Sequence, residues 1–221
     1  MHSSETQVNG WTLELEGISN ATISNSELVD TYVRGFAAVS VYDSSFSRRV
    51  LSYDSSRTYI YNSTTDSLSS RQNSRLWLVN STSNTYSIVD QSEVYVSWYL
   101  DVHVVDSISQ DVPSANVTAT YPNATVAEWR LTDANGWARL TLIEKMMNAT
   151  DSYPVGNYTV TAKYEVYMGQ QSVNMTGNKE ITVTLPFIIP EFPPALILPL
   201  LMIITLIIGV LSERRKILHK E

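Results

Sequence analysis

The sequence predicts an all-β ectodomain followed by one C-terminal transmembrane α-helix. Three observations predict this fold class. A phrase recurs about every eighteen residues in the first half, strict apolar–polar alternation follows it, and an uncharged apolar run lies near the end. These patterns are typical of β-helix coils, a β-sandwich and a membrane span, respectively. The expected division is a disordered start at 1–10, β-helix-like repeats at 11–97, a sandwich module at 98–186, a proline-rich join at 187–194, a transmembrane helix at 195–211 and a cytoplasmic basic tail at 212–221.

Composition narrows the range of functions. Without the four basic and two acidic residues of the tail, the chain holds 11 Lys plus Arg against 20 Asp plus Glu, an acidic balance that argues against nucleic-acid binding. Cysteine is absent, so packing and backbone hydrogen bonds must stabilise the fold. The first ten residues contain no apolar signal segment although the topology requires export, so we expect a truncated N-terminus or a span that acts as its own signal.

The repeat is defined by the phrases ATISNS, VSVYDS, TYIYNS and LWLVNS. Its apolar anchors, spaced by 18, 19 and 18 residues, are Ile23, Val41, Ile60 and Leu78, and Val94 with Val96 resemble a fifth repeat. Two residues after each anchor stand Asn25, Asp43, Asn62 and Asn80, each followed by serine at Ser26, Ser44, Ser63 and Ser81. A second apolar column is expected at Leu13, Val33, Leu51, Leu68 and Ile88.

This spacing favours a parallel β-helix in which the Asn/Asp column occupies a left-handed bend and its amides bond along the stack. An antiparallel sandwich with Asn-Ser turns is the alternative. The pattern resembles the last coils of the right-handed, pectate-lyase-like β-helix repeats of archaeal and bacterial surface proteins. Such stacks need a cap, and none is visible in residues 1–10, which again indicates a truncated start.

Residues 98–186 contain alternating strands bounded by turn residues, as in a sandwich. Trp98, Leu100, Val102 and Val104 share one face of the first strand, with Tyr99, Asp101 and His103 on the other. The phrases VPSANV, TDANGWARLTL and GNYTVTA resemble the carboxypeptidase-regulatory-like, prealbumin-like family, although Asp111 and Val112 replace its usual glycine. That resemblance implies a structural module.

The join contains prolines that exclude a regular helix or a central strand. Pro190, Glu191, Phe192 and Pro193, followed by an apolar run and a basic tail, resemble the PEF-CTERM sorting signal of archaeal surface proteins, which implies processing by an archaeosortase and transfer to lipid. The alternative is an unprocessed anchor with Phe192 at headgroup depth. Basic residues after the span predict a single-pass protein of the cell membrane with its N-terminus outside, and these residues are Arg214, Arg215, Lys216 and Lys220.

We expect no enzyme activity, no cofactor and no metal site. His2, His103 and His219 fall in three separate regions. Asp133, Asn135 and Asp151 could approach a calcium ion, but turn chemistry is the favoured interpretation. Arg57 and Arg75 are expected to lack acidic partners on matching coils.

Eight asparagines stand in N-x-S/T sites. Asn62 and Asn80 fall in the expected amide column, where a glycan would not fit. Glycosylation is therefore expected at the other six, namely Asn20, Asn116, Asn123, Asn148, Asn157 and Asn174.

Outward positions of the repeat carry aromatic residues that form a candidate glycan-binding stripe, namely Tyr42, Tyr59, Tyr61, Trp77 and Tyr95. The alternative is that these rings only pack along the sheet. The expected function is a membrane-anchored surface protein for display and adhesion, with the bilayer, surface polysaccharide or surface-layer proteins as partners. The alternatives are the inert C-terminal part of a surface polysaccharide lyase or hydrolase, and a structural subunit of a surface layer.

Overall fold

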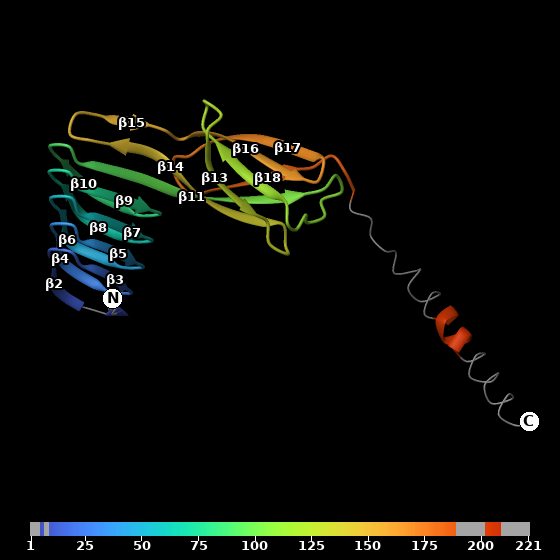
Figure 1. Cartoon of the computed structure of the whole chain (residues 1–221), viewed down its shortest axis with the longest axis horizontal. Coiled ribbons are helices and arrows are strands. Elements are labelled where there is room, and N and C mark those ends of the chain that lie inside the picture. The colour runs from blue at the N-terminus through green and yellow to red at the C-terminus, as the bar shows by residue number, and fades with distance from the viewer. Residues whose placement is uncertain (1–4, 7–8, 189–201, 209–221) are drawn as a thin grey trace, which may run out of the picture. The chain divides into compact units, whose positions relative to one another are not determined.

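The computed structural model describes residues 5–6, 9–188 and 202–208. The chain divides into two compact units, Met1–Phe187 and Ile188–Glu221. The first unit is built from strands (Figure 1), so the predicted all-β class with parallel stacking is confirmed for it.

The N-terminal half of this unit is a β-solenoid in which each coil contributes one strand to each of two facing parallel ladders. One ladder belongs to the mixed sheet, which contains β1 (Glu5–Thr6), β3 (Asn20–Ser24), β5 (Ala38–Tyr42), β7 (Arg57–Tyr61), β9 (Arg75–Val79) and β11 (Glu93–Val105) in spatial order. The other is the parallel sheet, which contains β2 (Asn9–Leu15), β4 (Glu27–Val33), β6 (Ser45–Ser52), β8 (Thr64–Ser70) and β10 (Thr82–Ile88). Residues 11–97 therefore form parallel coils, as predicted, and not the antiparallel sandwich that was the alternative.

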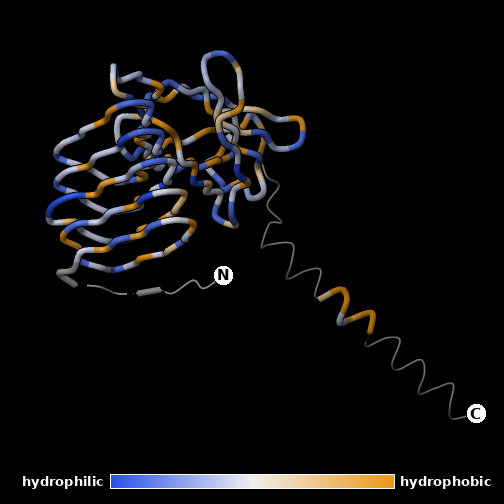
Figure 2. The backbone as a smooth tube through the Cα atoms, turned by 60° about the vertical axis from the view of Figure 1, so that its left-hand side comes forward, coloured by the Kyte–Doolittle hydropathy of each residue, from blue (hydrophilic) through white to orange (hydrophobic). Residues whose placement is uncertain are grey.

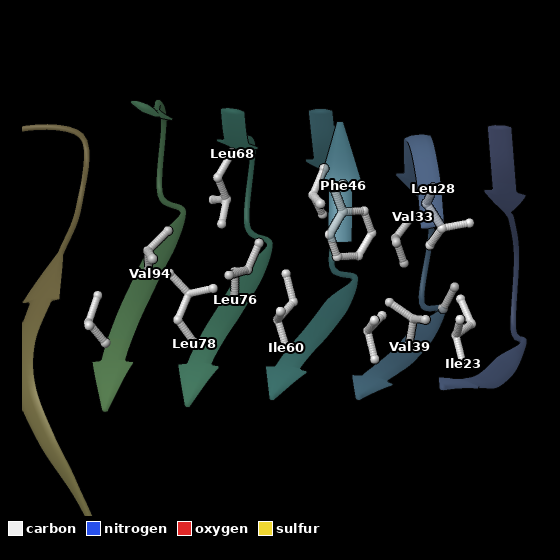
Figure 3. Packing of buried hydrophobic residues seen from close by; sticks show 14 of the residues in the cluster. Ile23, Leu28, Val33, Val39, Phe46, Ile60, Leu68, Leu76, Leu78 and Val94 are labelled. Atoms are coloured by element: carbon white, nitrogen blue, oxygen red, sulfur yellow. The ribbon is translucent and has the colours of Figure 1, made fainter. Parts of the chain in front are cut away.

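The predicted anchors pair in register along the mixed sheet as Ile23, Val41, Ile60, Leu78 and Val96. All are buried and face apolar side chains of the parallel sheet, such as Leu28 and Leu68 (Figure 3). Because the side-chain period of a strand is two, each anchor contacts its neighbours above and below and leaves the alternate residues outside. The fifth repeat is confirmed.

The predicted second apolar column is wrong. In the parallel sheet Leu13, Thr31, Val50 and Leu68 form one column, and Leu15, Val33, Ser52, Ser70 and Ile88 form the next. Leu51 pairs instead with Tyr32 and Ser69. For Leu51 the reason is a bulge: where β4 advances two residues from Leu28 to Asp30, β6 advances three from Phe46 to Arg49. One extra residue moves the following side chains to the neighbouring column. Val33 and Ile88 lie two residues beyond the column of Leu13, at the next inward position of their strands.

The predicted Asn/Asp bend is confirmed. Asn25, Asp43, Asn62 and Asn80 all have φ between 48° and 50°, the left-handed region that Asn and Asp tolerate. Their side chains form an amide ladder, in which Asn62 Nδ2 donates to Asp43 Oδ1 and Asn80 Nδ2 donates to Asn62 Oδ1, each at 3.0 Å. Asn178, in the loop before β18, extends it by donating to Asn80 Oδ1 at 2.7 Å.

The serines that follow are buried and satisfy the backbone at the same bend. The amide N–H of Ser44 donates to Ser63 Oγ at 2.9 Å, and that of Ser63 donates to Ser81 Oγ at 3.0 Å. Each hydroxyl also donates to the carbonyl two residues earlier. Serine is thus required here because a buried N–H without an acceptor would cost about 1–3 kcal/mol.

The opposite bend contains a second ladder that the sequence analysis missed. Gly35, Asp54, Gln72 and Asp90 also have positive φ. The backbone N–H of each of the first three donates to a side-chain oxygen of the corresponding residue in the next coil, namely Asp54, Gln72 or Asp90, at 2.7–3.1 Å. The column was missed because Gly, Asp and Gln share no sequence signature.

Strand β11 joins the solenoid to the C-terminal module without a linker and crosses the boundary expected at residue 98. Its first half pairs in parallel with β9, and its second half pairs in parallel with β18 (Lys179–Thr184). Along its other edge it pairs antiparallel with β14 (Trp137–Met147), which also pairs with β15 (Ser152–Pro154). The mixed sheet therefore runs uninterrupted through both halves.

The antiparallel sheet completes the sandwich and contains β13 (Val126–Leu131), β12 (Asn116–Thr120), β16 (Asn157–Tyr164) and β17 (Tyr167–Asn174) in spatial order. Its inward residues Val117 and Val160 are buried, as are Leu100 and Leu140 on the mixed sheet. Tyr158 links the sheets by donating its hydroxyl to the Ile143 carbonyl at 2.8 Å. Alternating segments of residues 98–186, such as those of β11, β14 and β16, are thus strands, whereas β15 and most of β17 do not alternate in burial.

In the second unit the structure describes a helix at residues 202–208, within the span expected at 195–211, and its residues are hydrophobic except for Thr205 (Figure 2). Over the described residues, no helix reaches the length and apolarity needed to cross a bilayer. The remainder of that span, the motif at Pro190–Pro193 and the basic residues after 211 lie outside the described ranges.

Thr31 is a defect in the solenoid core. It is 1% exposed, lies between Leu13 and Val50 in an apolar column, and its hydroxyl has no hydrogen-bond partner. Replacing Thr31 with valine should increase the free energy of unfolding by about 1 kcal/mol, because the isosteric methyl group needs no partner. Urea unfolding measures this. A matched Thr58→Val change, which removes a hydroxyl bonded to Ser52, should have the opposite sign.

Candidate functional site

The five predicted aromatic residues lie together on the outer side of the mixed sheet. Tyr42, Tyr59, Tyr61, Trp77 and Tyr95, here called the aromatic face, alternate with buried residues along β5, β7, β9 and β11. The parallel register that stacks the anchors inside therefore also stacks these rings outside.

The rings form two columns. Tyr42 stacks on Tyr61 with centroids 4.6 Å apart and planes at 6°. In the other column Trp77 lies 4.5 Å from Tyr59 and 5.6 Å from Tyr95, at angles of 9° and 8°. Both faces of the Trp77 ring are thus covered by neighbouring rings. A sugar that binds by stacking needs an open ring face, and the column interior does not offer one.

Two rings at the column ends are different. Tyr42 pairs with Ser24 on its other side, and Tyr59 pairs with Ser40. A serine side chain is too small to cover an aromatic ring. The face of Tyr42 toward β3 and the face of Tyr59 toward β5 are therefore open to a flat ligand, whereas Tyr61 and Tyr95, at the other ends of the columns, pair with the larger side chains of Val79 and Met146.

Charged groups border the aromatic face. Arg75 Nε donates to Glu93 Oε2 at 2.9 Å, and the Tyr95 hydroxyl donates to the same oxygen at 2.8 Å. The expectation that Arg75 lacks an acidic partner is therefore wrong. Arg75 and Glu93 lie directly opposite each other in the β9–β11 register, a pairing that the repeat spacing of eighteen residues could have revealed.

The outer side of the mixed sheet continues onto the sandwich. Arg139 on β14 makes a bidentate ion pair with Asp101, at 2.7 and 2.9 Å, and its guanidinium lies 5.0 Å from the Tyr99 ring centroid. His103 stacks on Trp137 at 4.3 Å, and its Nε2 lies 2.7 Å from Asp111 Oδ1. Sequence reasoning placed Tyr99, Asp101 and His103 on one face, but the partners on β14 depend on the strand pairing.

Burial raises the pKa of three tyrosine hydroxyls on this surface. It raises the pKa of Tyr61, whose neighbours Tyr42, Tyr59 and Tyr99 add to the effect, and it raises the pKa of Tyr95, which also bonds to Glu93. The pKa of Tyr99 is raised mainly by burial as well. These hydroxyls lie on the same surface as the Arg75–Glu93 and Arg139–Asp101 ion pairs.

These shifts predict sensitivity to alkali. Above pH about 10 the unfolded chain loses tyrosine protons that the folded chain retains, so unfolding releases protons and stability falls as pH rises. We expect the denaturation midpoint to be constant from pH 7 to 9 and to drop beyond 10. Urea titrations at each pH, with tyrosinate absorbance followed in parallel, test this. A flat midpoint would show that the rings titrate normally.

The structure places the six expected glycosylation sites on the surface of the first unit. Asn20, Asn116, Asn123, Asn157 and Asn174 are exposed and Asn148 is partly exposed. Asn157 and Asn174 face each other directly across β16 and β17. Asn62 is exposed too, but both its amide nitrogen and its amide oxygen are engaged in the amide ladder.

The expected turn residues behave as turn residues. Asp133 Oδ1 accepts the N–H groups of Asn135 and Trp137, each at 2.9 Å, and Gly136 adopts a φ of 73°. Within the described residues, no group of three or more His, Cys, Asp or Glu side chains is arranged to hold a metal ion.

No protein-family model matches this chain, and no curated protein matches it. Among solved structures it is similar to the Bacillus anthracis TIE protein, with 13% identity and a TM-score of 0.32 over 48% of this chain and 18% of that one. It is also similar to GBS52, the minor pilin of the Gram-positive pathogen Streptococcus agalactiae, with 13% identity and a TM-score of 0.30 over 46% of this chain and 52% of that one. The chain thus matches less than two thirds of either protein, and neither likeness identifies its family.

Proposed function

We propose that this chain is a membrane-anchored cell-surface protein whose solenoid is held away from the bilayer by the sandwich. The observation that carries the proposal is the continuity of β11. One strand from Glu93 to Val105 belongs to both halves, so the solenoid cannot swing relative to the sandwich without breaking backbone hydrogen bonds. A rigid connection of this kind favours a display or structural role over a catalytic one.

The anchor in this proposal is the uncharged run at 195–211, followed by four basic residues. Seventeen helical residues would span about 25 Å, the short end of what a bilayer core requires. Pro190–Pro193 would then serve either as an interfacial join or as a sorting signal read by an archaeosortase. Mass spectrometry of the mature C-terminus distinguishes them, because processing would remove the basic tail.

Protease protection tests the anchor. The full chain is expressed with one epitope at each end, and protease is added to intact cells. We expect loss of the N-terminal epitope and, if the tail is retained, protection of the C-terminal epitope. Replacing Arg214, Arg215 and Lys216 with glutamate should weaken that protection. Digestion of the C-terminal epitope from outside would refute the orientation.

Glycosylation follows from the same proposal and has a sharp internal contrast. Asn62 and Asn80 stand in N-S-T sites, yet each amide both donates and accepts in the amide ladder, with Asn178 above Asn80. We expect glycan on the six other sites and none on these two. Glycopeptide mass spectrometry of native protein measures occupancy. A glycan found on Asn62 would contradict the amide ladder, because the folded ladder leaves no room for a glycan there.

Glycan binding by the aromatic face is a second candidate function, supported by the open ring faces of Tyr42 and Tyr59. Binding of surface polysaccharide should be lost in Tyr42→Ala and Tyr59→Ala proteins. Trp77→Tyr is the control, since its ring faces are covered already and the stack is kept. If all three variants bind polysaccharide as well as the unchanged protein does, the aromatic face has a structural role alone.

The rival function, the inert end of a polysaccharide lyase or hydrolase, predicts an acid cluster upstream of this sequence.

A further inference from the structure

Exposed apolar side chains gather at the end of the sandwich from which the chain continues toward residue 188. Ile108 in the β11–β12 loop is 54% exposed, and in the β16–β17 hairpin Val166 is 83%, Tyr167 36% and Met168 50% exposed. We call these four residues the apolar tip. They come from two loops that lie at the same end of the first unit in Figure 1.

Phe187 connects the two loops. Its ring stacks on Tyr164 at 5.6 Å and on Tyr167 at 4.7 Å, which brackets the turn that carries Val166. Its carbonyl accepts the N–H of Ser107, the residue before Ile108, at 2.8 Å. The apolar tip is therefore a defined surface built around the last residue of the first unit, and not a set of scattered side chains.

Turn geometry does not require these residues. Tyr164 pairs with Tyr167, so Glu165 and Val166 form a two-residue hairpin loop, where Gly, Asn or Asp is usual. A β-branched apolar residue at its apex gains nothing from the turn and leaves most of its surface in water. Grouped exposed apolar residues of this kind mark a contact surface.

We propose that the apolar tip rests in the headgroup region of the bilayer and so seats the ectodomain on the membrane. This rests on the proposed anchor at 195–211. Only residues 188–194 separate Phe187 from that span, and even fully extended they reach about 25 Å. The tip is therefore tethered to the membrane at a millimolar effective concentration, at which a weak contact is well populated.

The chemistry of the tip suits this occupant. Tyrosines flank the apolar apex, and aromatic rings with a polar end favour the membrane–water interface. The adjoining charges are Glu165 and Lys163, which offset each other, and Lys163 lies opposite Met168, where its long stem can reach toward headgroups. The expected depth is therefore shallow, about 5–10 Å.

The absence of cysteine allows a direct test with single labels. The full chain carrying Val166→Cys is labelled with an environment-sensitive fluorophore and reconstituted into phosphatidylcholine vesicles, some with a quencher at a shallow acyl position. We expect a blue-shifted emission and loss of about half the intensity to the lipid quencher. Ala149→Cys, an exposed position in the β14–β15 turn, is the matched control and should show neither change.

A label at Thr205→Cys, measured with a quencher at the end of the acyl chain because residue 205 lies near the middle of the proposed span, separates the two proposals. Quenching at 205 but not at 166 would overturn the membrane contact of the tip and leave the anchor intact. Quenching at neither position would overturn the anchor, and the tip contact with it. A blue shift at 166 without lipid quenching would mean that protein, and not lipid, covers the tip, which also overturns the proposal. Double replacement Val166→Ser and Met168→Ser should abolish quenching of a label at Ile108→Cys.

Discussion

Replacing Ile60 with alanine should lower the free energy of unfolding by about 3–4 kcal/mol. Ile60 is 0% exposed and lies in the middle of its column, between Val41 and Leu78. Neither strand can move inward to fill the cavity, because each is held by its own ladder of hydrogen bonds. Urea unfolding followed by circular dichroism measures the loss.

Because β11 is shared, the effect should extend beyond the solenoid. Hydrogen exchange of amides around Leu140, in the sandwich, should accelerate together with that of amides around Ile60. Ile88→Ala is the matched control: this isoleucine is partly buried on β10, the last strand of the parallel sheet, and should cost about half as much. Faster exchange confined to the solenoid would show that its coils unfold separately from the sandwich.

The sequence predicted those parts of the solenoid that depend on residue type at a fixed spacing. Asn25 and Asn62 mark a bend because few residues adopt a positive φ, and Ser63 marks it because the buried backbone requires an acceptor there. Ile60 and Leu78 were recognisable because apolar residues must recur at each coil. The alternation in Val102 and Leu140 revealed sandwich strands for the same local reason.

Features that depend on pairing were not predictable in this way. The bulge opposite Leu28 moved Leu51 out of the predicted second column by one position, and no residue type marks a bulge of this kind. The second bend is occupied by different residue types, at Gly35, Asp54 and Gln72, so no residue type recurs there to mark it in the sequence. The parallel pairing of β18 with β11 joins residues about eighty positions apart, and only the tertiary fold brings Asn178 to the end of the amide ladder.

The candidate site was predicted in its members but not in its geometry. Alternation placed Tyr61, Trp77 and Tyr95 on the outer side, as the structure has them. Register then determines that rings stack on rings, which closes the ring faces that a sugar would need. Packing is therefore the principal energetic role expected of Trp77, the one interior ring of the two columns.

Replacing Trp77 with alanine should therefore destabilise the protein by about 2–3 kcal/mol, even though its side chain is on the outer side of the sheet. The change removes both of its stacking contacts, with Tyr59 and Tyr95, each about 0.5–1.5 kcal/mol beyond the area buried. Thermal and urea unfolding of the full chain measure the loss.

Trp129→Ala is the matched control. Trp129 also lies on the outer side of a sheet, on β13, but it is 54% exposed and stacks on no other ring among the described residues, so its loss should cost less than about 1 kcal/mol. Trp77→Tyr should recover most of the stability by keeping a flat ring between its two neighbours. Equal costs at positions 77 and 129 would show that stacking along the aromatic face contributes little. Unchanged melting of Trp77→Ala together with lost polysaccharide binding would instead make Trp77 a binding residue.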